Sequence, residues 1–272
     1  MIRTKIERTP IIRQVYGYLM KRRFETNGYG DFWGVYKTFE EAIEAAPKSK
    51  HIGYNHAELA QEYQQMLEQN RWENNYDCVI ADYDYPILFW LNSIFNQEEV
   101  KTIFDFGGNV GIHFYNYAKY LKYSQGLTWI ICEVPEIAKL GRKIADKRGV
   151  DNLEFTYNFE NTDGKDIFIA LGSIQYIEDI QIKLSNLKRP RHLLINRLAL
   201  YNGEQFVTLQ NGGNNVYYPQ YIFNKTEFIE KLESIGYKLI DIWKNRGDCT
   251  KIPLHPEKTY HGSYGLYFKL EN

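Results

Sequence analysis

The spacing of hydrophobic residues along the chain changes at about residue 100. Beyond it, short apolar runs alternate with segments in which apolar residues recur every three or four positions. The runs are typical of buried strands and the periodic segments of helices. Strands alternating with helices indicate an α/β protein, with a mostly parallel sheet covered by helices on both faces. The predicted strands are residues 102–106, 127–132, 153–157, 166–171, 192–196, 239–243 and 264–268, and the predicted helices are 111–122, 135–148, 178–187 and 224–235.

The first 99 residues predict helices joined by irregular connections. Capping-box patterns begin at Thr38 and at Asn55, each with an acidic residue three positions later, and the second helix extends to about residue 69. Pro86 suits the first turn of a helix that runs to Phe95. We therefore expect a helical N-terminal region at 1–99 and a sheet domain at 100–272, with an insertion at 201–223.

Residues 1–25 combine basic side chains with apolar ones at helical spacing, and Pro10 interrupts the pattern. A segment of this kind docks on a membrane surface, or packs on its own domain, or packs on a second copy in a homodimer. The sequence leaves these alternatives open.

Composition narrows the class of protein. The chain of 272 residues is 44% hydrophobic, enough for a substantial core, and its formal net charge is −1. Balanced charge disfavours nucleic acid as a partner, because nucleic-acid binding normally requires a basic stripe. Three separated cysteines without CxxC or HxxxH spacing predict no metal site and suit a reducing cytoplasm. No apolar run approaches the ~20 residues of a membrane span.

The segment 102–111 carries the most specific pattern in the chain. A buried strand ends in a glycine turn, and a helix pattern follows. Gly107 allows a sharp turn, and Gly111 lets the backbone approach a ligand without a Cβ atom in the way. A strand, a glycine turn and a helix in this order begin a nucleotide-binding βαβ unit.

A set of mostly polar residues stands at the ends of the predicted strands. In parallel sheets the ligand lies at the carboxyl ends of the strands, so these residues are expected to meet at one edge. A carboxylate at the end of the second strand is suited to accept hydrogen bonds from ribose hydroxyls. The strand-end residues are Asp105, Glu133, Asn158, Phe159, Gly172, Ser173 and Gln175.

The sequence of the glycine turn distinguishes between classes of nucleotide-binding site. A dinucleotide site would have a third glycine, and a P-loop would have a Gly-Lys-Ser/Thr ending; both are missing. The turn instead resembles motif I of the class I S-adenosylmethionine-dependent methyltransferases, an acidic residue followed by GxGxG. Asp105, Gly107 and Gly111 match this motif, whereas Asn109 replaces the middle glycine. Asparagine tolerates a left-handed backbone, so the turn is expected to keep its shape.

The chain also resembles a narrower group, the uncharacterised methyltransferases found near polysaccharide-biosynthesis genes. The likeness spans roughly residues 30 to 270. It rests on the segments 32–42, 51–55, 105–111, 173–176, 192–197 and 218–223.

The resemblance implies a Rossmann-like methyltransferase fold with S-adenosylmethionine as cofactor. Asp105 and the turn, including Gly107, Gly108, Asn109 and Gly111, would bind its methionine part. Glu133 would bind the ribose, and Val134 would cover one face of the adenine. Asn158 or Phe159 would meet the adenine edge. The segment 173–176 would lie beside the sulfonium and the acceptor, and Gly172 before it would contact the cofactor.

An alcohol acceptor requires a general base, and His113 is the candidate nearest to the turn. The alternative is that His113 only lines the first helical turn. Gln175 and Tyr176 are candidates for orienting the acceptor. The tyrosine-rich insertion 201–223 suits a cover over a small-molecule substrate, with Tyr217 and Tyr218 binding it, or else is an ordinary surface β-excursion.

These patterns together predict methyl transfer to an oxygen of a sugar or another small polar metabolite. Two alternatives stay open. One is a nicotinamide-dependent oxidoreductase, and the other is a non-catalytic binding protein with a methyltransferase fold.

Overall fold

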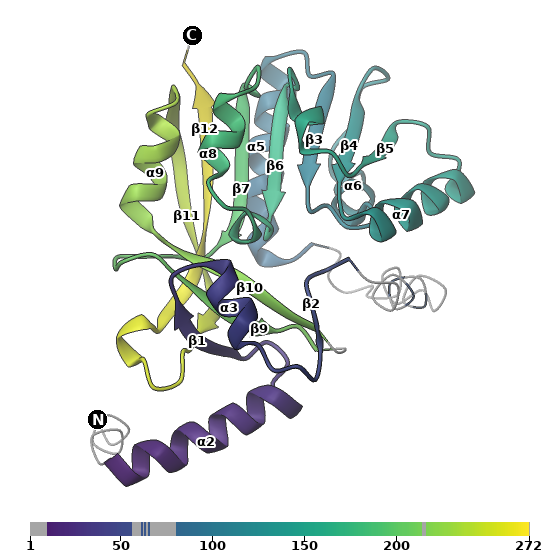
Figure 1. The fold of residues 1–272 in the computed structure, drawn as a ribbon. Helices are drawn as coiled ribbons and strands as arrows, with labels where there is room; N and C mark the ends of the chain where they lie inside the picture. Colours follow the sequence, from purple (N-terminus) through teal and green to yellow (C-terminus); the bar gives the residue numbers. More distant parts are fainter. Residues whose placement is uncertain are drawn as a thin grey trace. The chain divides into compact units, whose positions relative to one another are not determined.

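The computed structural model describes residues 10–55, 61, 63, 65, 80–213 and 216–271 (Figure 1). Contacts divide the chain into two compact units, each built from three segments. Unit 1 consists of Met1–Tyr54, Ala199–Lys225 and Arg246–Ser263, and unit 2 consists of Asn55–Leu198, Thr226–Asn245 and Tyr264–Asn272.

Unit 2 contains the predicted sheet. Its seven strands have the order β11-β12-β7-β6-β3-β4-β5. The five strands from β3 to β7 are parallel, and β12 pairs antiparallel with β7. The strands are β3 (Thr102–Phe106), β4 (Thr128–Cys132), β5 (Leu153–Thr156), β6 (Ile167–Leu171), β7 (His192–Leu198), β11 (Tyr237–Thr250) and β12 (Tyr260–Leu270).

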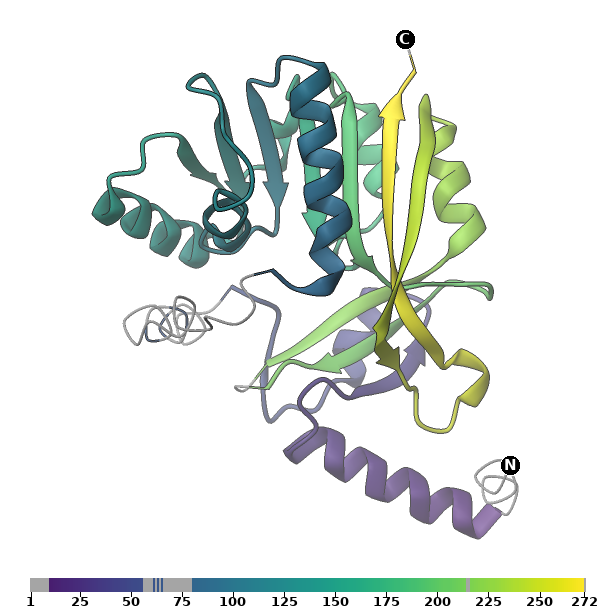
Figure 2. The same cartoon turned by 180° about the vertical axis from the view of Figure 1, so that it is seen from behind.

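Helices cover both faces of this sheet. Helix α5 (Tyr85–Gln97) lies in front of the sheet in Figure 2, and α8 (Ile180–Ser185) and α9 (Lys225–Glu233) lie in front of it in the opposite view of Figure 1. Apolar residues three or four positions apart in α5, such as Ile87, Leu91 and Ile94, are buried in the same cluster as Trp129. The other helices in the described part of unit 2 are η1 (Asp82–Asp84), α6 (Ile112–Tyr117), α7 (Pro135–Arg148), η2 (Phe159–Thr162) and η3 (Ile174–Tyr176).

The predicted α/β architecture is confirmed, with differences in detail. Helix α6 is only six residues long, about half the predicted length. Strands β11 and β12 extend well beyond the predicted ranges, because their far ends fall in segments assigned to unit 1. The helix predicted at 55–69, residues 1–9 and Cys78 lie outside the fully described part of the chain.

Unit 1 contains a second sheet, of the order β1-β9-β10-β2, with β8 paired to β10. The pattern of the first 99 residues did not predict β1 and β2, which are extended because they pair with strands of the insertion 201–223. The elements are α2 (Pro10–Thr26), β1 (Phe32–Tyr36), α3 (Phe39–Ala45), β2 (His51–Ile52), β8 (Leu200–Tyr201), β9 (Phe206–Asn211), β10 (Val216–Asn224) and η4 (Pro256–Lys258).

The contacts do not follow the predicted boundary at residue 100. Helix α5 lies before that boundary, yet it belongs to unit 2 because its apolar face fills the core of the seven-stranded sheet. The insertion 201–223 belongs with the N-terminal strands in unit 1.

Helix α2 exposes a row of apolar side chains. They occur at positions 11, 12, 15, 18 and 19, which share one helical face, and each is at least 43% exposed. No helix within the described residues combines the length and apolar character that crossing a bilayer requires.

Candidate functional site

The turn between β3 and α6 contains three residues with left-handed backbone. The φ angles are 74° at Gly107, 57° at Asn109 and 100° at Gly111. The side-chain Oδ1 of Asn109 accepts a hydrogen bond from the Val110 N–H at 2.7 Å, which helps to hold this conformation. The prediction that asparagine preserves the turn is confirmed.

Asp105 lies directly beneath this turn and is completely buried. A Cβ atom added at Gly108 would stand only 2.5 Å from the Asp105 carboxylate, so the turn passes over this carboxylate more closely than a residue with a Cβ atom could. Its Oδ2 accepts a hydrogen bond from Trp129 Nε1 at 3.1 Å. Its Oδ1 is buried and has no partner among the described residues. A buried carboxylate oxygen without a donor is costly, which suits a site that a ligand completes.

Glu133 links the end of β4 to the same turn. Its Oε1 accepts a hydrogen bond from the Asn109 N–H at 3.1 Å, and its Oε2 accepts one from the Val134 N–H at 3.0 Å. Burial, with a smaller contribution from the charge of Asp105, raises the pKa of Glu133 to about 7 despite the lowering effect of the two N–H donors. This carboxylate is therefore poised to change its charge near neutral pH.

Asp105 and Glu133 stand where the strand order of the sheet reverses. The chain passes from β3 to β4 and β5 on one side and returns to β6 on the other side of β3. Loops diverge at such a point and leave a crevice at the carboxyl ends of the strands, where ligands bind in open α/β sheets. The topology thus places the glycine turn at the position where this class of fold binds ligands.

The loop after β6 packs against the glycine turn. A Cβ atom at Gly107 would lie 2.4 Å from that of Ser173, whose hydroxyl donates a hydrogen bond to the Phe106 carbonyl. Gln175 is buried, and its Nε2 donates to the Gly172 carbonyl at 2.8 Å, while its Oε1 has no partner within the described residues. Tyr176 follows in η3 and is partly buried.

Two residues expected at the adenine edge have structural partners. Asn158 is exposed and caps η2, since its Oδ1 accepts from the Glu160 N–H at 3.2 Å. The ring of Phe159 packs edge-on against Phe106, with a centroid separation of 5.8 Å. Val134 is partly buried and precedes α7. These contacts fix the two loops beside the turn, and a role in binding a base stays a prediction.

His113 faces Asp105 from the first turn of α6. Its Nδ1 lies 3.8 Å from the Asp105 Oδ2, and its side chain is 20% exposed. Burial lowers the pKa of His113, but the carboxylates of Asp105 and Asp84 outweigh this effect and hold the pKa above its ordinary value. The imidazole is therefore both a candidate base and the positive partner of two carboxylates.

Three polar residues of this region were missed by the sequence analysis. Asn196 and Arg197 lie near the carboxyl end of β7, at the same edge of the sheet as Asp105 and Glu133. The strand-end rule used for the first four strands would have found them. Asp84 is buried in the turn before α5, and burial raises the pKa of its carboxyl. Nothing in the sequence around Asp84 distinguishes it from an ordinary helix-capping residue.

Comparison with known proteins identifies the fold. No family model matches the sequence, and no curated protein sequence shows significant similarity to it. A candidate S-adenosylmethionine-dependent methyltransferase from Listeria monocytogenes has a similar structure, with a TM-score of 0.50 and 11% identity over 71% of this chain and 100% of that one. A second, an S-adenosylmethionine-dependent methyltransferase from Clostridium acetobutylicum, has a TM-score of 0.50 and 13% identity over 77% and 99%. The fold is that of the S-adenosylmethionine-dependent methyltransferases. At these identities the likeness concerns the fold alone.

Tyr217 and Tyr218, expected to bind substrate, pack inside unit 1. Tyr217 is fully buried and stacks on Phe24 with a centroid separation of 5.0 Å. Tyr218 is 6% exposed and stacks on Tyr54 at 3.8 Å. Their rings are already covered by aromatic neighbours, so this packing assigns both residues to the core of unit 1, and we leave them out of the site.

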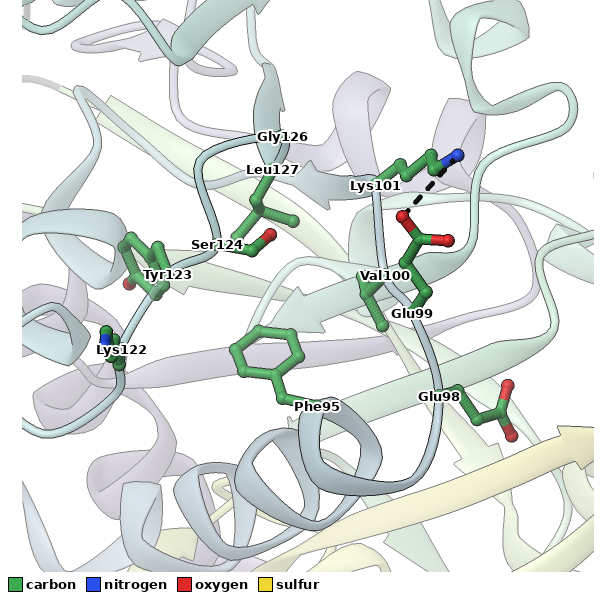
Figure 3. Close-up of a pocket in the computed structure, with 10 residues that line it drawn as sticks. All are labelled: Phe95, Glu98, Glu99, Val100, Lys101, Lys122, Tyr123, Ser124, Gly126 and Leu127. Carbon is green, nitrogen blue, oxygen red and sulfur yellow. Dashed lines mark ion pairs between the residues drawn. The ribbon is translucent and has the colours of Figure 1, made fainter.

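A separate pocket of about 480 Å³ opens at the amino ends of β3 and β4 (Figure 3). Its lining includes Lys101 and Leu127, which directly precede these strands, and an ion pair joins Lys101 to Glu99 at 3.7 Å. The glycine turn lies at the opposite ends of the strands, so this pocket is not the ligand crevice of the fold. Within the described residues, no three His, Cys, Asp or Glu side chains gather in a way that could hold a metal ion.

Proposed function

We propose that the protein is an enzyme that transfers a methyl group from S-adenosylmethionine to an oxygen of a sugar or another small polar metabolite. The observation that carries the proposal is the hydrogen bond between Glu133 and the glycine turn at the reversal of the strand order. This arrangement joins a ribose-binding carboxylate to a backbone turn that a ligand can approach closely.

The residues of the site fit the cofactor. The turn passes so close to Asp105 that it leaves no room for a side chain at Gly108. The buried Oδ1 of Asp105 has no hydrogen-bond donor within the described chain. In this proposal Asp105 and the turn bind the methionine part, and Glu133 binds the ribose hydroxyls. Val134 covers one adenine face, and Asn158 or Phe159 meets its edge. The bound cofactor supplies an electrophilic methyl group.

The residues around the methyl position orient the acceptor and exclude water from it. In the proposal Gly172 and Ser173 line this position, and Gln175 and Tyr176 hold the acceptor. His113 accepts the proton of the acceptor hydroxyl at Nε2, because its Nδ1 faces Asp105. Only the neutral imidazole can accept this proton.

The choice of a sugar-like acceptor rests on the resemblance to the methyltransferases found near polysaccharide-biosynthesis genes. Balanced charge across the chain supports a small acceptor over a nucleic acid. No observation favours the oxidoreductase alternative.

Titration calorimetry with S-adenosylhomocysteine, S-adenosylmethionine and NAD tests the proposal. We expect the first two to bind and NAD to give no heat of binding. Transfer of labelled methyl groups to a panel of sugars then separates an enzyme from a non-catalytic binding protein. Binding of NAD alone would contradict the proposal.

A further inference from the structure

Arg197 adopts an unusual backbone conformation at the carboxyl end of β7. Its φ angle is 53°, in the left-handed region that residues with a Cβ atom seldom occupy. The pairing between β7 and β12 changes register here, since Tyr264 pairs with Leu198 whereas Leu266 pairs with Ile195. This β-bulge gives β7 one extra residue. Bulges of this kind redirect a side chain and are common next to ligand sites.

Asn196 holds the bulge in place. It is 1% exposed, and its Nδ2 donates to the Tyr83 carbonyl at 2.7 Å. Its Oδ1 accepts three hydrogen bonds, from the Arg197 N–H at 2.9 Å, Trp243 Nε1 at 3.2 Å and Asn245 Nδ2 at 3.0 Å. A single buried side chain thus ties together three parts of unit 2. The strained conformation of Arg197 is fixed by its surroundings and does not depend on its own side chain.

The guanidinium of Arg197 is oriented by an aromatic ring, and no acidic side chain of the described residues forms an ion pair with it. It lies over the ring of Tyr83, with its central carbon 4.8 Å from the ring centroid. The residue is exposed, and within the described chain its guanidinium makes no hydrogen bond or ion pair. Stacking on one face restricts the rotamer and leaves the N–H groups at the edge available. A planar fork of N–H donors held in this way matches the two oxygens of a carboxylate or phosphate.

Arg197 also stands next to the proposed site of methyl transfer. A Cβ atom at Gly172 would lie 3.8 Å from that of Arg197, and Gly172 precedes Ser173, which packs against Gly107 in the turn. One loop therefore lies between the Cβ atom of Arg197 and the glycine turn. Burial raises the pKa of Asp84, and the charge of Arg197 opposes this rise. The pKa of His113 is also raised overall, against the lowering effects of burial and of the Arg197 charge.

We propose that Arg197 binds an oxyanion of the methyl acceptor, so that the acceptor is a small sugar-like molecule bearing a carboxylate or a phosphate. This inference rests on the proposed function for the identity of the ligand as an acceptor. The anion site itself consists of Arg197, stacked on Tyr83 and positioned by Asn196. An acceptor anchored here by its anionic group would present its hydroxyl groups toward the loop of Gly172 and Ser173.

The test uses three probes of similar size: glucuronate, glucose 6-phosphate and glucose. Each is titrated calorimetrically into the full-length protein, with and without saturating S-adenosylhomocysteine, in a buffer free of phosphate. The variants are Arg197→Gln and Arg197→Asn, the second because asparagine tolerates the left-handed backbone. Lys143→Gln, which removes one exposed positive charge on α7, is the matched control. Circular dichroism checks the fold of each variant.

We expect at least one anionic sugar to bind at least about tenfold more tightly than glucose, the scale of a charge-assisted hydrogen bond. Both Arg197 variants should lose this preference, and Lys143→Gln should keep it. Preference for glucuronate alone identifies a carboxylate, and preference for glucose 6-phosphate alone identifies a phosphate.

Equal binding of glucose and both anions would overturn the proposal, as would an anion preference that survives in the folded Arg197 variants. A matching loss of S-adenosylhomocysteine affinity in these variants would assign Arg197 to the cofactor carboxylate instead. Failure of the wild type to bind S-adenosylhomocysteine would contradict the proposed function, whereas anion binding by the ligand-free protein tests Arg197 separately.

Discussion

The carboxylate of Glu133 accepts a hydrogen bond from the backbone N–H of Asn109 at 3.1 Å, so the group expected to bind ribose is tied directly to the glycine turn. Because the pKa of Glu133 is raised to about 7, the free protein holds this carboxyl partly protonated at neutral pH. Ribose hydroxyls donate to the ionised form. We therefore expect the affinity for S-adenosylhomocysteine to fall by about tenfold from about pH 8 to about pH 6, which calorimetry at several pH values measures.

Glu133→Gln is the variant that tests this assignment, because it cannot titrate. Its affinity should be lower at about pH 8 and should change little with pH. Glu154→Gln on the exposed side of β5 is the control and should behave as the wild type. A pH dependence that is unchanged in folded Glu133→Gln would remove Glu133 from the binding equilibrium.

Gly108→Ala tests how closely the turn must approach Asp105. The added Cβ atom would stand 2.5 Å from the carboxylate, so the turn or the carboxylate must move. We expect a loss of about 1–3 kcal/mol in the free energy of unfolding, the usual cost of overpacking, and a clear loss of S-adenosylhomocysteine affinity. Gly126→Ala adds the same methyl group where no atom lies within 4 Å and should be neutral in both measurements. Equal behaviour of the two variants would show that the turn yields easily.

His113 contributes a pH-dependent term to stability. Its pKa in the folded protein is raised above the ordinary 6.5, so its contribution is fully present below about pH 6.5 and is lost as the pH rises through the folded pKa. The difference in melting temperature between the wild type and His113→Gln should therefore shrink from about pH 6 to about pH 9. A constant difference over this range would argue against a charged imidazole between Asp105 and Asp84.

The same histidine gives a kinetic prediction. If His113 accepts the proton of the acceptor, methyl transfer should increase with pH above 6.5, because the neutral imidazole becomes more abundant. His113→Ala should reduce the turnover of labelled methyl groups more than it reduces the calorimetric affinity for S-adenosylhomocysteine. Full turnover in this variant would leave His113 with only its electrostatic role.

Tyr217→Ala should act on stability. The side chain is fully buried against Phe24, so its truncation leaves a cavity and should cost about 3–5 kcal/mol, the range for large aromatic residues. Tyr18→Ala, at a site that is 66% exposed on α2, is the control. Thermal unfolding measures both. Wild-type stability with lost methyl transfer in Tyr217→Ala would restore the tyrosine to a substrate site.

The seven-stranded sheet could be predicted because its signal is local. Each strand is a compact apolar run. Gly107 marks the end of a strand, and Pro135 and Gly149 mark the start and the end of a helix, because their backbone preferences alone favour these positions. The second sheet gave no such signal. Strand β1 pairs with β9, and Phe32 lies opposite Gln210. These partners are far apart in the sequence, and the periodicity of a single sequence does not show which distant strands pair. The division into units was missed for the same reason.

The site could be predicted as far as strand ends identify it. Asp105, Glu133 and Ser173 were found from that rule, and the structure brings their loops together. Asp84 was missed because it reaches the site through the packing of α5 and not through a strand. Tyr217 was expected to bind substrate because composition shows that tyrosines are abundant but not whether their rings are covered.

The three-segment composition of unit 1 has a consequence for synthesis on the ribosome. Strands β1 and β2 emerge among the first residues of the chain, but their partners β9 and β10 follow only at Phe206–Asn211 and Val216–Asn224. In the meantime β3 to β7 of unit 2 are complete and can pair in the order of their appearance. The N-terminal strands must therefore wait with unpaired edges while most of the other sheet forms, which makes the closure of unit 1 a late, long-range folding event.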